Sequence, residues 1–539
     1  MLLITPDQKL PLRPKGPQLF VDYRNISVGD INWVDPATVG TGEKPKKMSQ
    51  WGPALPEPVA VADTPFGIRI EAEKAHLIGP IFPTDKPWEQ AYLMYVNNVI
   101  VHEGKYKMWY TVVPPDHHDT PDLKWHWDVG WVLCYAESED GLNWHKPELG
   151  LQDYKGEPTN WVYGRELSPN HFASGAVFLD ETAPPEERFK LIYRAEEKYD
   201  DPAGFLARQK ERFGEDMDPK STKGKPGKEG TFATTAGAVS ADGIHWKALP
   251  EPLVMYCSDQ MNTAFWDEKI QKYVSYFRMQ RAGRRSAGRT ETSDFKTWST
   301  PYPVLEVPLT AHPASDIMHC PVQKYPGTDD VYLMYATMFN INTNNRDIAL
   351  AVSSDGLYWN WSPGNRIASP NDGTSEFEYD DLEAGYGIVD LPGDRIGIPI
   401  VGYEKPYKYP RFGRPKLGIP GYATWKKDRV SAVVADDRGQ FTTHSLVVTG
   451  NELSINFKTQ GSAGSVRIEA LDAKGNVIPG FSLDDAPLLS GDELARKVTW
   501  RGGDIADLAG QTVQLRFNLH LAKIYAFEFK SEAQTALTQ

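Results

Sequence analysis

Short apolar runs separated by polar turns recur along the middle of the chain. Between about residue 88 and residue 435, five similar units each contain a run of aromatic and aliphatic residues of strand length. The runs are Tyr106–Tyr110, Phe189–Tyr193, Tyr273–Tyr276, Tyr332–Tyr335 and Ile396–Ile400. Runs of this length and composition are typical of buried β-strands. A helical pattern is hard to find, and the best case, Pro202–Phe213, is short and polar.

One short sequence is repeated after strands of this kind. Its copies are Ser138–Trp144, Ser240–Trp246, Thr292–Trp298 and Ser353–Trp359, and glycine follows the aspartate of Ser/Thr-x-Asp-x-x-x-Trp in three of the four. This pattern predicts a hairpin turn. The aspartate would cap the turn, the glycine would take a positive φ, and the tryptophan would begin the return strand. A recurring strand-and-turn unit predicts a radial repeat, and five four-stranded units predict a five-bladed β-propeller.

The segments on either side of these units differ in composition. Residues 1–60 are rich in proline and glycine and are predicted to form an extension that wraps the main domain, with an N-terminal strand able to close the ring. Residues 61–435 would form the propeller. Beyond these, short alternating strands separated by turns predict a β-sandwich over residues 436–539. The predicted fold class is all-β, a five-bladed β-propeller followed by a C-terminal β-sandwich.

Polar residues occupy matching points near the first strand of several units. Three units carry the related patterns Asp259–Asn262, Asp316–His319 and Asp380–Glu383, in which an aspartate is followed three residues later by Asn, His or Glu. His171 stands at this point in the second unit, and Glu89 lies near it in the first. Because the first strand of each blade lines the central channel, we expect these side chains to surround the axis.

The connection between the second and third strands of each unit should lie on the same face as these polar residues, because the strands are antiparallel. The segments assigned to these connections are Pro114–Gly130, Glu197–Gly230, Gln280–Ser286, Asn340–Arg346 and Glu404–Gly418. They are read as long, dissimilar insertions, whereas the repeated turns on the opposite face are uniform. Varied loops at one end of a rigid scaffold are typical of a binding site.

Carboxylates gathered around an open axis suit the cleavage of a glycosidic bond, which needs one acid and one further carboxylate. We expect Glu383 to be the general acid, with a pKa raised by neighbouring carboxylates, and Asp316 to be the base. Asp259 would orient the sugar and tune the acid. His319 could serve as the acid instead, because histidine titrates near neutral pH. The alternative for each aspartate is a structural one, as the cap of a turn that leads into a strand.

Further residues are candidates for contact with a sugar. Trp127 and Tyr403 lie on or beside the variable connections, where aromatic rings can stack on sugar C–H faces or simply pack the loops. Arg281 belongs to a basic segment with Arg284 and Arg285. If two of these arginines point inward, the substrate is anionic or phosphate is the attacking group. Otherwise the segment is a solvated loop. The remaining expected substrate contacts are His319, Asn262, His171, Glu89 and Asp380.

Composition excludes several classes of protein. The net charge of −14 argues against a nucleic-acid partner, and no apolar run is long enough to span a membrane. Three cysteines do not form a disulfide framework. His117, His118 and Asp119 lack a spaced partner and are interpreted as surface or pocket residues rather than metal ligands. The N-terminal apolar run is too short for a signal peptide, so a cytoplasmic protein is expected unless a leader has been removed.

Several of these segments resemble the five-bladed glycoside hydrolases of the fructosidase and arabinanase/xylosidase superfamily. The resemblance is found in Ala136–Gly150, in Asp259–Asp267 and in the C-terminal segments Gly480–Leu483 and Leu515–Leu519. It implies three carboxylates at the axis and, in many members, a water molecule or metal ion in the channel. The repeated turn is also similar to the Asp-box of sialidases, which lies opposite the active site.

The sequence therefore predicts an exo-acting glycoside hydrolase with a carbohydrate substrate and no required cofactor. By analogy we expect an inverting mechanism, which places the two carboxylates roughly 6.5–9.5 Å apart. Two alternatives stay open: a carbohydrate-binding propeller without catalysis, and a phosphorolytic enzyme on the same scaffold. The sugar, its linkage and the oligomeric state are left open by the sequence.

Overall fold

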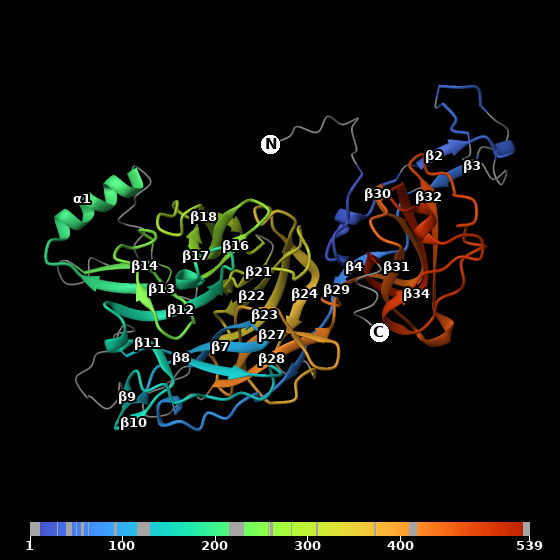
Figure 1. The fold of residues 1–539 in the computed structure, drawn as a ribbon. Helices are drawn as coiled ribbons and strands as arrows, with labels where there is room; N and C mark the ends of the chain where they lie inside the picture. Colours follow the sequence, from blue (N-terminus) through green and yellow to red (C-terminus); the bar gives the residue numbers. More distant parts are fainter. Residues whose placement is uncertain are drawn as a thin grey trace.

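The computed structural model describes most of the chain between residues 11 and 531. The residues not described are 1–10, 30, 39–45, 50, 55–58, 63, 91–93, 116–129, 215–230, 257, 259–261, 282, 309–310, 371–372, 409–417 and 532–539. Figure 1 shows two groups of strands side by side, a ring of blades and a C-terminal sheet. Among the described residues, no helix has both the length and the apolar character needed to cross a bilayer.

Five antiparallel sheets form the blades of the propeller, which confirms the predicted architecture. The first comprises β6 (Met94–His102), β7 (Lys105–Val112), β8 (Val132–Ser138) and β11 (Trp161–Gly164). The second comprises β12 (His171–Leu179), β13 (Phe189–Lys198), β14 (Thr231–Ser240) and β15 (Lys247–Ala248). The third comprises β16 (Thr263–Asp267), β17 (Lys272–Arg281), β18 (Arg284–Thr292) and β19 (Tyr302–Leu305).

The fourth blade comprises β20 (Ser315–His319), β21 (Val322–Lys324), β22 (Tyr332–Asn340), β23 (Asn345–Ser353) and β24 (Asn360–Ala368). The fifth comprises β25 (Asp381–Ala384), β26 (Val389–Leu391), β27 (Arg395–Tyr403) and β28 (Gly418–Lys426), and it is completed by β5 (His76–Ile78). An N-terminal strand thus closes the ring, but it lies beyond residues 1–60. Because β5 supplies the outer strand, the fifth unit does not need the repeated turn.

The repeated turn has the predicted geometry. In the first copy, Asp140 Oδ1 accepts the backbone N–H groups of Leu142 at 2.9 Å and Asn143 at 2.8 Å. Gly141 has a φ of +74°, and the indole N–H of Trp144 donates to its carbonyl at 2.9 Å. The copy without glycine places Phe295 at a φ of 56°, so the turn keeps its shape at a strained position.

These turns also join neighbouring blades. Trp109 on β7 donates its indole N–H to the carbonyl of Gly243 in the second blade at 2.8 Å. Tyr276 on β17 donates to the carbonyl of Gly356 in the fourth blade at 2.8 Å. A Cβ on Gly243 would lie 2.5 Å from the Trp109 ring, so the glycine permits this close approach as well as the positive φ. The repeat therefore serves the assembly of the ring.

Two of the expected long insertions are absent. Strands β22 and β23 stay paired up to Asn340 and Asn345, so Asn340–Arg346 is a tight hairpin. Strands β17 and β18 stay paired up to Arg281 and Arg284, so Gln280–Ser286 is a tight hairpin rather than a variable loop. A polar segment can extend two strands beyond the body of the blade, and the sequence pattern does not distinguish this from an insertion. In the second blade the connection contains α1 (Pro202–Phe213), whose first turn is capped by Asp201 accepting the Gly204 N–H at 2.9 Å.

The C-terminal strands form an eight-stranded antiparallel sheet. Its members are β1 (Gln18–Leu19), β4 (Arg69–Ala72), β29 (Ser431–Thr442), β30 (Leu446–Val447), β31 (Glu452–Thr459), β32 (Ser465–Asp472), β33 (Asp492–Lys497) and β34 (Thr512–Lys530). The long strand β34 pairs with β32 through its first half and with β31 through its second half. Phe20, Phe441, Phe517 and Phe527 pack in the core that these strands enclose.

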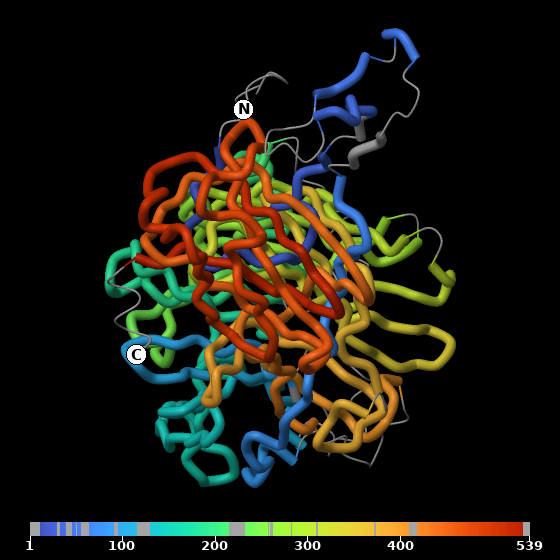
Figure 2. The backbone as a smooth tube through the Cα atoms, turned by 90° about the vertical axis from the view of Figure 1, so that its right-hand side faces the viewer, coloured from blue at the N-terminus to red at the C-terminus, as the bar shows by residue number. Residues whose placement is uncertain are grey.

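Segments from before the propeller take part in this sheet. Strand β4, within residues 61–435, pairs with β29, and β1 pairs with the second half of β34. A two-stranded ribbon of β2 (Ile31–Val34) and β3 (Val59–Ala62) lies above the upper end of the C-terminal sheet in Figures 1 and 2. The other short elements are β9 (Asp153–Tyr154), β10 (Glu157–Pro158), η1 (Tyr23–Asn25), η2 (Pro36–Thr38), η3 (Pro87–Glu89), η5 (Arg165–Leu167), η6 (Pro185–Glu187), η8 (Gly461–Ala463) and η9 (Ile505–Leu508).

Candidate active site at one end of the propeller axis

The site is built from the beginnings of inner strands in the fourth and fifth blades. Strand β20 carries Asp316 and His319, and β25 carries Glu383, all three of them buried. A β-bulge between Ile317 and His319 interrupts the alternation of β20. Asp316 contacts the third blade, whereas His319 contacts the fifth. The repeated turns follow the other ends of the third strands and so lie on the opposite face.

Glu383 is held between a histidine and an arginine. Its Oε2 accepts Nη1 of Arg346, and its Oε1 lies against Nδ1 of His319. The histidine contact is close but is not aligned as a hydrogen bond, and within the described part of the chain neither ring nitrogen of His319 has a hydrogen-bond partner. The ring of Tyr95 lies 6.2 Å from the His319 ring, and Tyr95 stacks on Trp131 at 5.8 Å.

The charges of this group differ from the sequence-based expectation. Burial raises the pKa of Glu383, but the Arg346 guanidinium and His319 outweigh it, so that the pKa lies below its ordinary value. Burial lowers the pKa of the His319 imidazole, and the Glu383 carboxylate opposes this only in part. Near neutral pH, Glu383 is therefore ionised and His319 is neutral. The predicted rise in the pKa of Glu383 is wrong, because its nearest charged partner is a cation rather than another carboxylate.

Arg346 at the start of β23 is the centre of a buried ionic network. Its Nε donates to Asp381 Oδ1 at 2.9 Å and its Nη2 to Oδ2 at 2.7 Å, a bidentate pair. The rings of Tyr403 and Tyr407 lie 5.2 and 4.6 Å from the guanidinium carbon. Tyr403, expected to stack on a sugar, is thus fully buried beneath the guanidinium. Arg346 and Asp381 were missed from the sequence, although Asp381 directly follows the expected Asp380.

Asp316 has an arginine of its own. Its Oδ1 accepts the backbone N–H of Arg285, and its Oδ2 lies 3.2 Å from Nη1 of the same residue. Arg278 on the neighbouring strand β17 is buried nearby, and burial, followed by the charge of Arg285, lowers its pKa to about 10. Arginines from two blades therefore face the acidic residues.

The other arginines of the hairpin point elsewhere. Arg281 has a largely exposed side chain that pairs with Glu306 at 2.8 Å, so its expected place in the site is wrong. Arg284 donates to the backbone carbonyl of Ser315 at 2.7 Å. Only Arg285 of the three makes a side-chain contact with an acidic site residue, so the condition set above for an anionic substrate or attacking phosphate is not met.

Glu89 has a structural role in the first blade. It is buried in an ion pair with Lys146 at 2.7 Å and accepts the hydroxyl of Tyr110 at 2.7 Å. None of its contacts involves Glu383 or Asp316, so the expected position at the axis is wrong. The surrounding aromatic residues, including Trp88, explain why the carboxylate needs a cation of its own.

The remaining expected contacts have different surroundings. Asp380 is partly exposed, and its backbone N–H donates to the Tyr403 carbonyl at 2.8 Å where the chain enters β25. His171 is the first residue of β12 and is partly exposed. Asn262 is fully buried, and among the described residues its amide has no hydrogen-bond partner.

Two predicted site residues, Asp259 and Trp127, lie outside the described residues, as do His117, His118 and Asp119. In the described part of the chain, no three histidine, cysteine, aspartate or glutamate side chains are grouped so that they could hold a metal ion. The predicted metal or water in the channel stays a prediction that the resemblance alone supports.

Comparison with known proteins gives matches to solved structures only. No protein-family profile and no curated protein matches the chain. A β-fructofuranosidase of family GH32 from Bombyx mori is 9% identical, with a TM-score of 0.38 over 84% of this chain and 96% of that one. An α-L-arabinofuranosidase from Podospora anserina, solved with cellotriose, is 11% identical, with a TM-score of 0.41 over 66% and 99%. A family 117 glycoside hydrolase from Zobellia galactanivorans is 12% identical, with a TM-score of 0.38 over 66% and 89%.

Proposed function

We propose that this protein is a glycoside hydrolase that removes a terminal sugar at the Asp316, His319 and Glu383 end of the propeller axis. The observation that carries the proposal is the buried contact between His319 and Glu383, with a further carboxylate, Asp316, on the same strand as the histidine. Hydrolysis of a glycosidic bond needs a proton donor and a carboxylate that activates water. Asp316, His319 and Glu383 could supply a proton donor and such a carboxylate, and all three lie on β-strands.

The charges favour a particular division of roles. Asp316 lies 3.2 Å from the Arg285 guanidinium, which holds the carboxylate in place, and we assign it as the base that takes a proton from water. His319 is the proposed acid: the ring donates a proton to the departing oxygen when protonated. Glu383 then lies behind the ring and stabilises the imidazolium. The sequence left two candidates for the acid, Glu383 and His319, and this assignment selects His319.

The test is an assay against aryl-glycosides and plant, algal and microbial polysaccharides. Wild type should release monosaccharide from at least one of them, and Asp316→Asn and His319→Asn should each lower kcat by about 10²–10⁴-fold while the variants stay folded at the assay temperature. Glu139→Gln, an exposed carboxylate on the opposite face, is the control. Turnover at the wild-type rate in both site variants would refute the assignment.

A carbohydrate-binding propeller without catalysis is the second candidate. It is favoured by one observation: Asp316 and Glu383 each contact an arginine, and such pairing holds carboxylates in place without freeing them for proton transfer. Binding of a sugar without release of product from any substrate in the panel would support this candidate. The phosphorolytic alternative required the Arg281–Arg285 segment in the site. Arg285 contacts Asp316, but Arg281 pairs with Glu306 instead, which does not support this alternative.

A further inference from the structure

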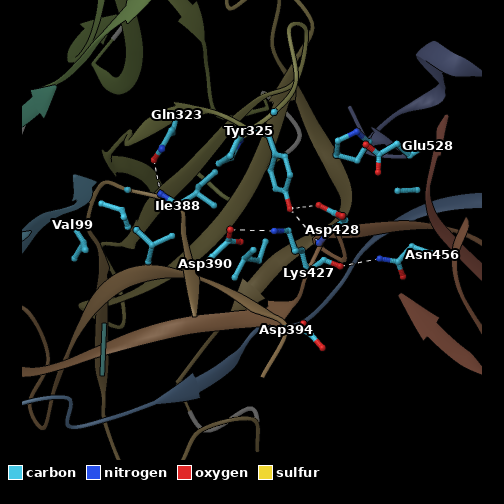
Figure 3. Close-up of a pocket in the computed structure, with 18 of the residues that line it drawn as sticks. Val99, Gln323, Tyr325, Ile388, Asp390, Asp394, Lys427, Asp428, Asn456 and Glu528 are labelled. Carbon is cyan, nitrogen blue, oxygen red and sulfur yellow. Dashed lines mark hydrogen bonds and ion pairs between the residues drawn. The ribbon is translucent and has the colours of Figure 1, made fainter. Parts of the chain in front are cut away.

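A cavity of about 1040 Å³ lies between the propeller and the C-terminal sheet (Figure 3). On the propeller side, residues such as Val99, Phe265 and Gln323 line the cavity. They lie toward or just beyond the ends of the inner strands that are farther from the candidate active site. On the other side it is lined by β31 and β34, including Asn456, Glu528 and Lys530. Since the candidate active site lies at the beginnings of inner strands, this cavity occupies the opposite end of the axis.

One wall of the cavity is already ordered by hydrogen bonds. Tyr325 donates its hydroxyl to Asp428 at 2.7 Å, and Lys427 pairs with Asp390 at 3.1 Å (Figure 3). Asn456 from the C-terminal sheet donates to the Lys427 carbonyl at 2.9 Å. These contacts fix the segment Lys427–Asp428 between the two domains. A ligand entering the cavity would therefore meet a pre-formed surface.

The opposite wall carries polar groups whose side chains have no such partners. Glu528 and Lys530 are two residues apart on β34, so they lie on the same face of the strand. Neither side chain has a hydrogen bond or ion pair within the described part of the chain, although Lys530 is buried. Burial raises the pKa of Glu528; the Lys530 charge opposes this shift, and the Asp428 carboxylate adds to it. A carboxyl group and an ammonium group thus stand side by side facing a cavity.

The chemistry of the lining selects one class of ligand. Its four carboxyl groups, Asp390, Asp394, Asp428 and Glu528, exceed its two ammonium groups, so a phosphate or uronate would be repelled. Adjacent hydroxyls of a sugar ring both donate and accept hydrogen bonds and so match a neighbouring carboxylate and ammonium. The rings of Tyr106, Trp266 and Tyr325 offer apolar surface for C–H faces.

We propose that this cavity binds a neutral oligosaccharide of two or three units, separately from the site of hydrolysis. Its volume lies at the upper end of the usual range for small-molecule sites, which leaves room for more than one sugar ring. Glu528 and Lys530 hold adjacent hydroxyls, and the aromatic residues of the blades contact the ring faces. The inference does not depend on catalysis at His319.

The experiment is calorimetric titration of the full-length protein with maltotriose, cellotriose, xylotriose, arabinotriose and inulotriose. All variants carry Asp316→Asn, so that hydrolysis does not consume the probe. At least one trisaccharide should bind, and Glu528→Gln or Lys530→Met should weaken that binding at least tenfold. Glu493→Gln, in the same sheet but not among the residues that line the cavity, is the matched control and should bind normally.

Two further variants separate this site from the active site. Ala495→Trp places a large ring at the exposed rim of the cavity without altering a buried residue, and it should abolish the same binding. Tyr95→Ala at the candidate active site should leave it unchanged. The proposal would be overturned if no trisaccharide binds, or if none of the three cavity variants affects binding. It would also be overturned if Tyr95→Ala abolishes binding, or if trigalacturonate binds more tightly than the neutral trisaccharides. Hydrolysis by wild type is a separate readout, so either proposal can fail alone.

Discussion

His319 Nδ1 and Glu383 Oε1 meet across the boundary between the fourth and fifth blades, with Arg346 on the other side of the carboxylate. The three side chains come from separate strands, so their relationship exists only in the closed ring. A carboxylate behind an imidazole ring stabilises its protonated form. Burial and two nearby arginines act against protonation. The balance between these effects sets the pH range in which His319 can act as an acid.

The pH dependence of hydrolysis follows from this balance. Because burial lowers the pKa of His319 below 6.5, the protonated acid accumulates only on the acidic side of that value. We expect kcat to rise as the pH falls below 6.5 and to decrease toward neutral and alkaline pH. Glu383→Gln removes the charge that favours the imidazolium, so the alkaline limb should move to lower pH and kcat at pH 6 should fall at least tenfold. Initial rates between pH 4 and 9 test this.

A different result in the two variants would contradict the assignment of His319 as the acid. If Glu383 were itself the acid, Glu383→Gln would abolish activity at every pH, and His319→Asn would keep a substantial rate. The order of effects in the two variants therefore distinguishes the two acids. Glu139→Gln, an exposed carboxylate on the opposite face, is the control and should leave the profile unchanged.

Arg346 should be essential for stability. Its removal would leave Asp381 and Glu383 buried without a cation, and breaking one side of a buried pair typically costs about 3–5 kcal/mol. We expect Arg346→Met to lower the free energy of unfolding by about that amount in urea titrations. Arg281→Met, in which an exposed pair is lost, should change it by less than about 1 kcal/mol. Equal effects in the two variants would contradict the structural role of Arg346.

The elements that repeat were predictable from the sequence, and the contacts between blades were not. The turn at Ser138–Trp144 specifies its own hydrogen bonds through residues close in the chain, so its geometry could be derived from the pattern. The residues Asp316, His319 and Glu383 were also placed correctly on inner strands. Arg346 was missed because a strand-initial arginine gives no local signal that it will face a carboxylate 37 positions away.

The errors have the same physical origin. Glu89 follows a tryptophan near the first inner strand, and only the fold shows that Lys146 reaches it. Arg281 sits on a hairpin whose pairing continues outward, which carries the side chain away from the axis. Both residue types were suited to a sugar-binding site, but the ion-pair partner of each side chain, Lys146 for Glu89 and Glu306 for Arg281, determined where it lies. The sequence pattern constrains such partners only when they lie within a few residues.

The aspartates of the repeated turns should make the protein sensitive to acid. Hydrogen bonds from Asn143 and Leu142 lower the pKa of Asp140 to about 2. Burial raises the pKa of Asp242, but hydrogen bonds from His245 and Ile244 leave it at about 2. A carboxyl group whose pKa is lower in the folded state stabilises the fold above its unfolded pKa and loses this effect as the pH falls. Unfolding stability should therefore decline between about pH 4 and pH 2.

This decline can be assigned to the turns by substitution. Asp242→Asn keeps an amide oxygen for the backbone N–H groups but cannot titrate, so the curve of melting temperature against pH should become flatter below pH 4. Glu139→Gln, within the first turn but with an exposed side chain, should leave the slope unchanged. A slope identical to that of wild type in Asp242→Asn would show that other groups govern acid unfolding.

Gly243 tests whether the turns hold neighbouring blades together. Its φ is +80°, and an added Cβ would lie 2.5 Å from the ring of Trp109 in the first blade. Gly104 has a similar φ of +76° but nothing within 4 Å of an added Cβ, so Gly104→Ala measures the backbone strain alone. We expect Gly104→Ala to cost about 1–2 kcal/mol and Gly243→Ala to cost about 1–3 kcal/mol more. Urea titrations of both variants give the difference.

A double-mutant cycle then identifies the source of the extra cost. Trp109→Leu removes the ring that a Cβ at position 243 would meet, together with the hydrogen bond to the Gly243 carbonyl. If the blades are coupled at this point, Gly243→Ala in the Trp109→Leu background should cost no more than Gly104→Ala does, so the two substitutions will be non-additive. Additive effects would mean that the turn is strained locally and that the contact between blades contributes little to the stability of the ring.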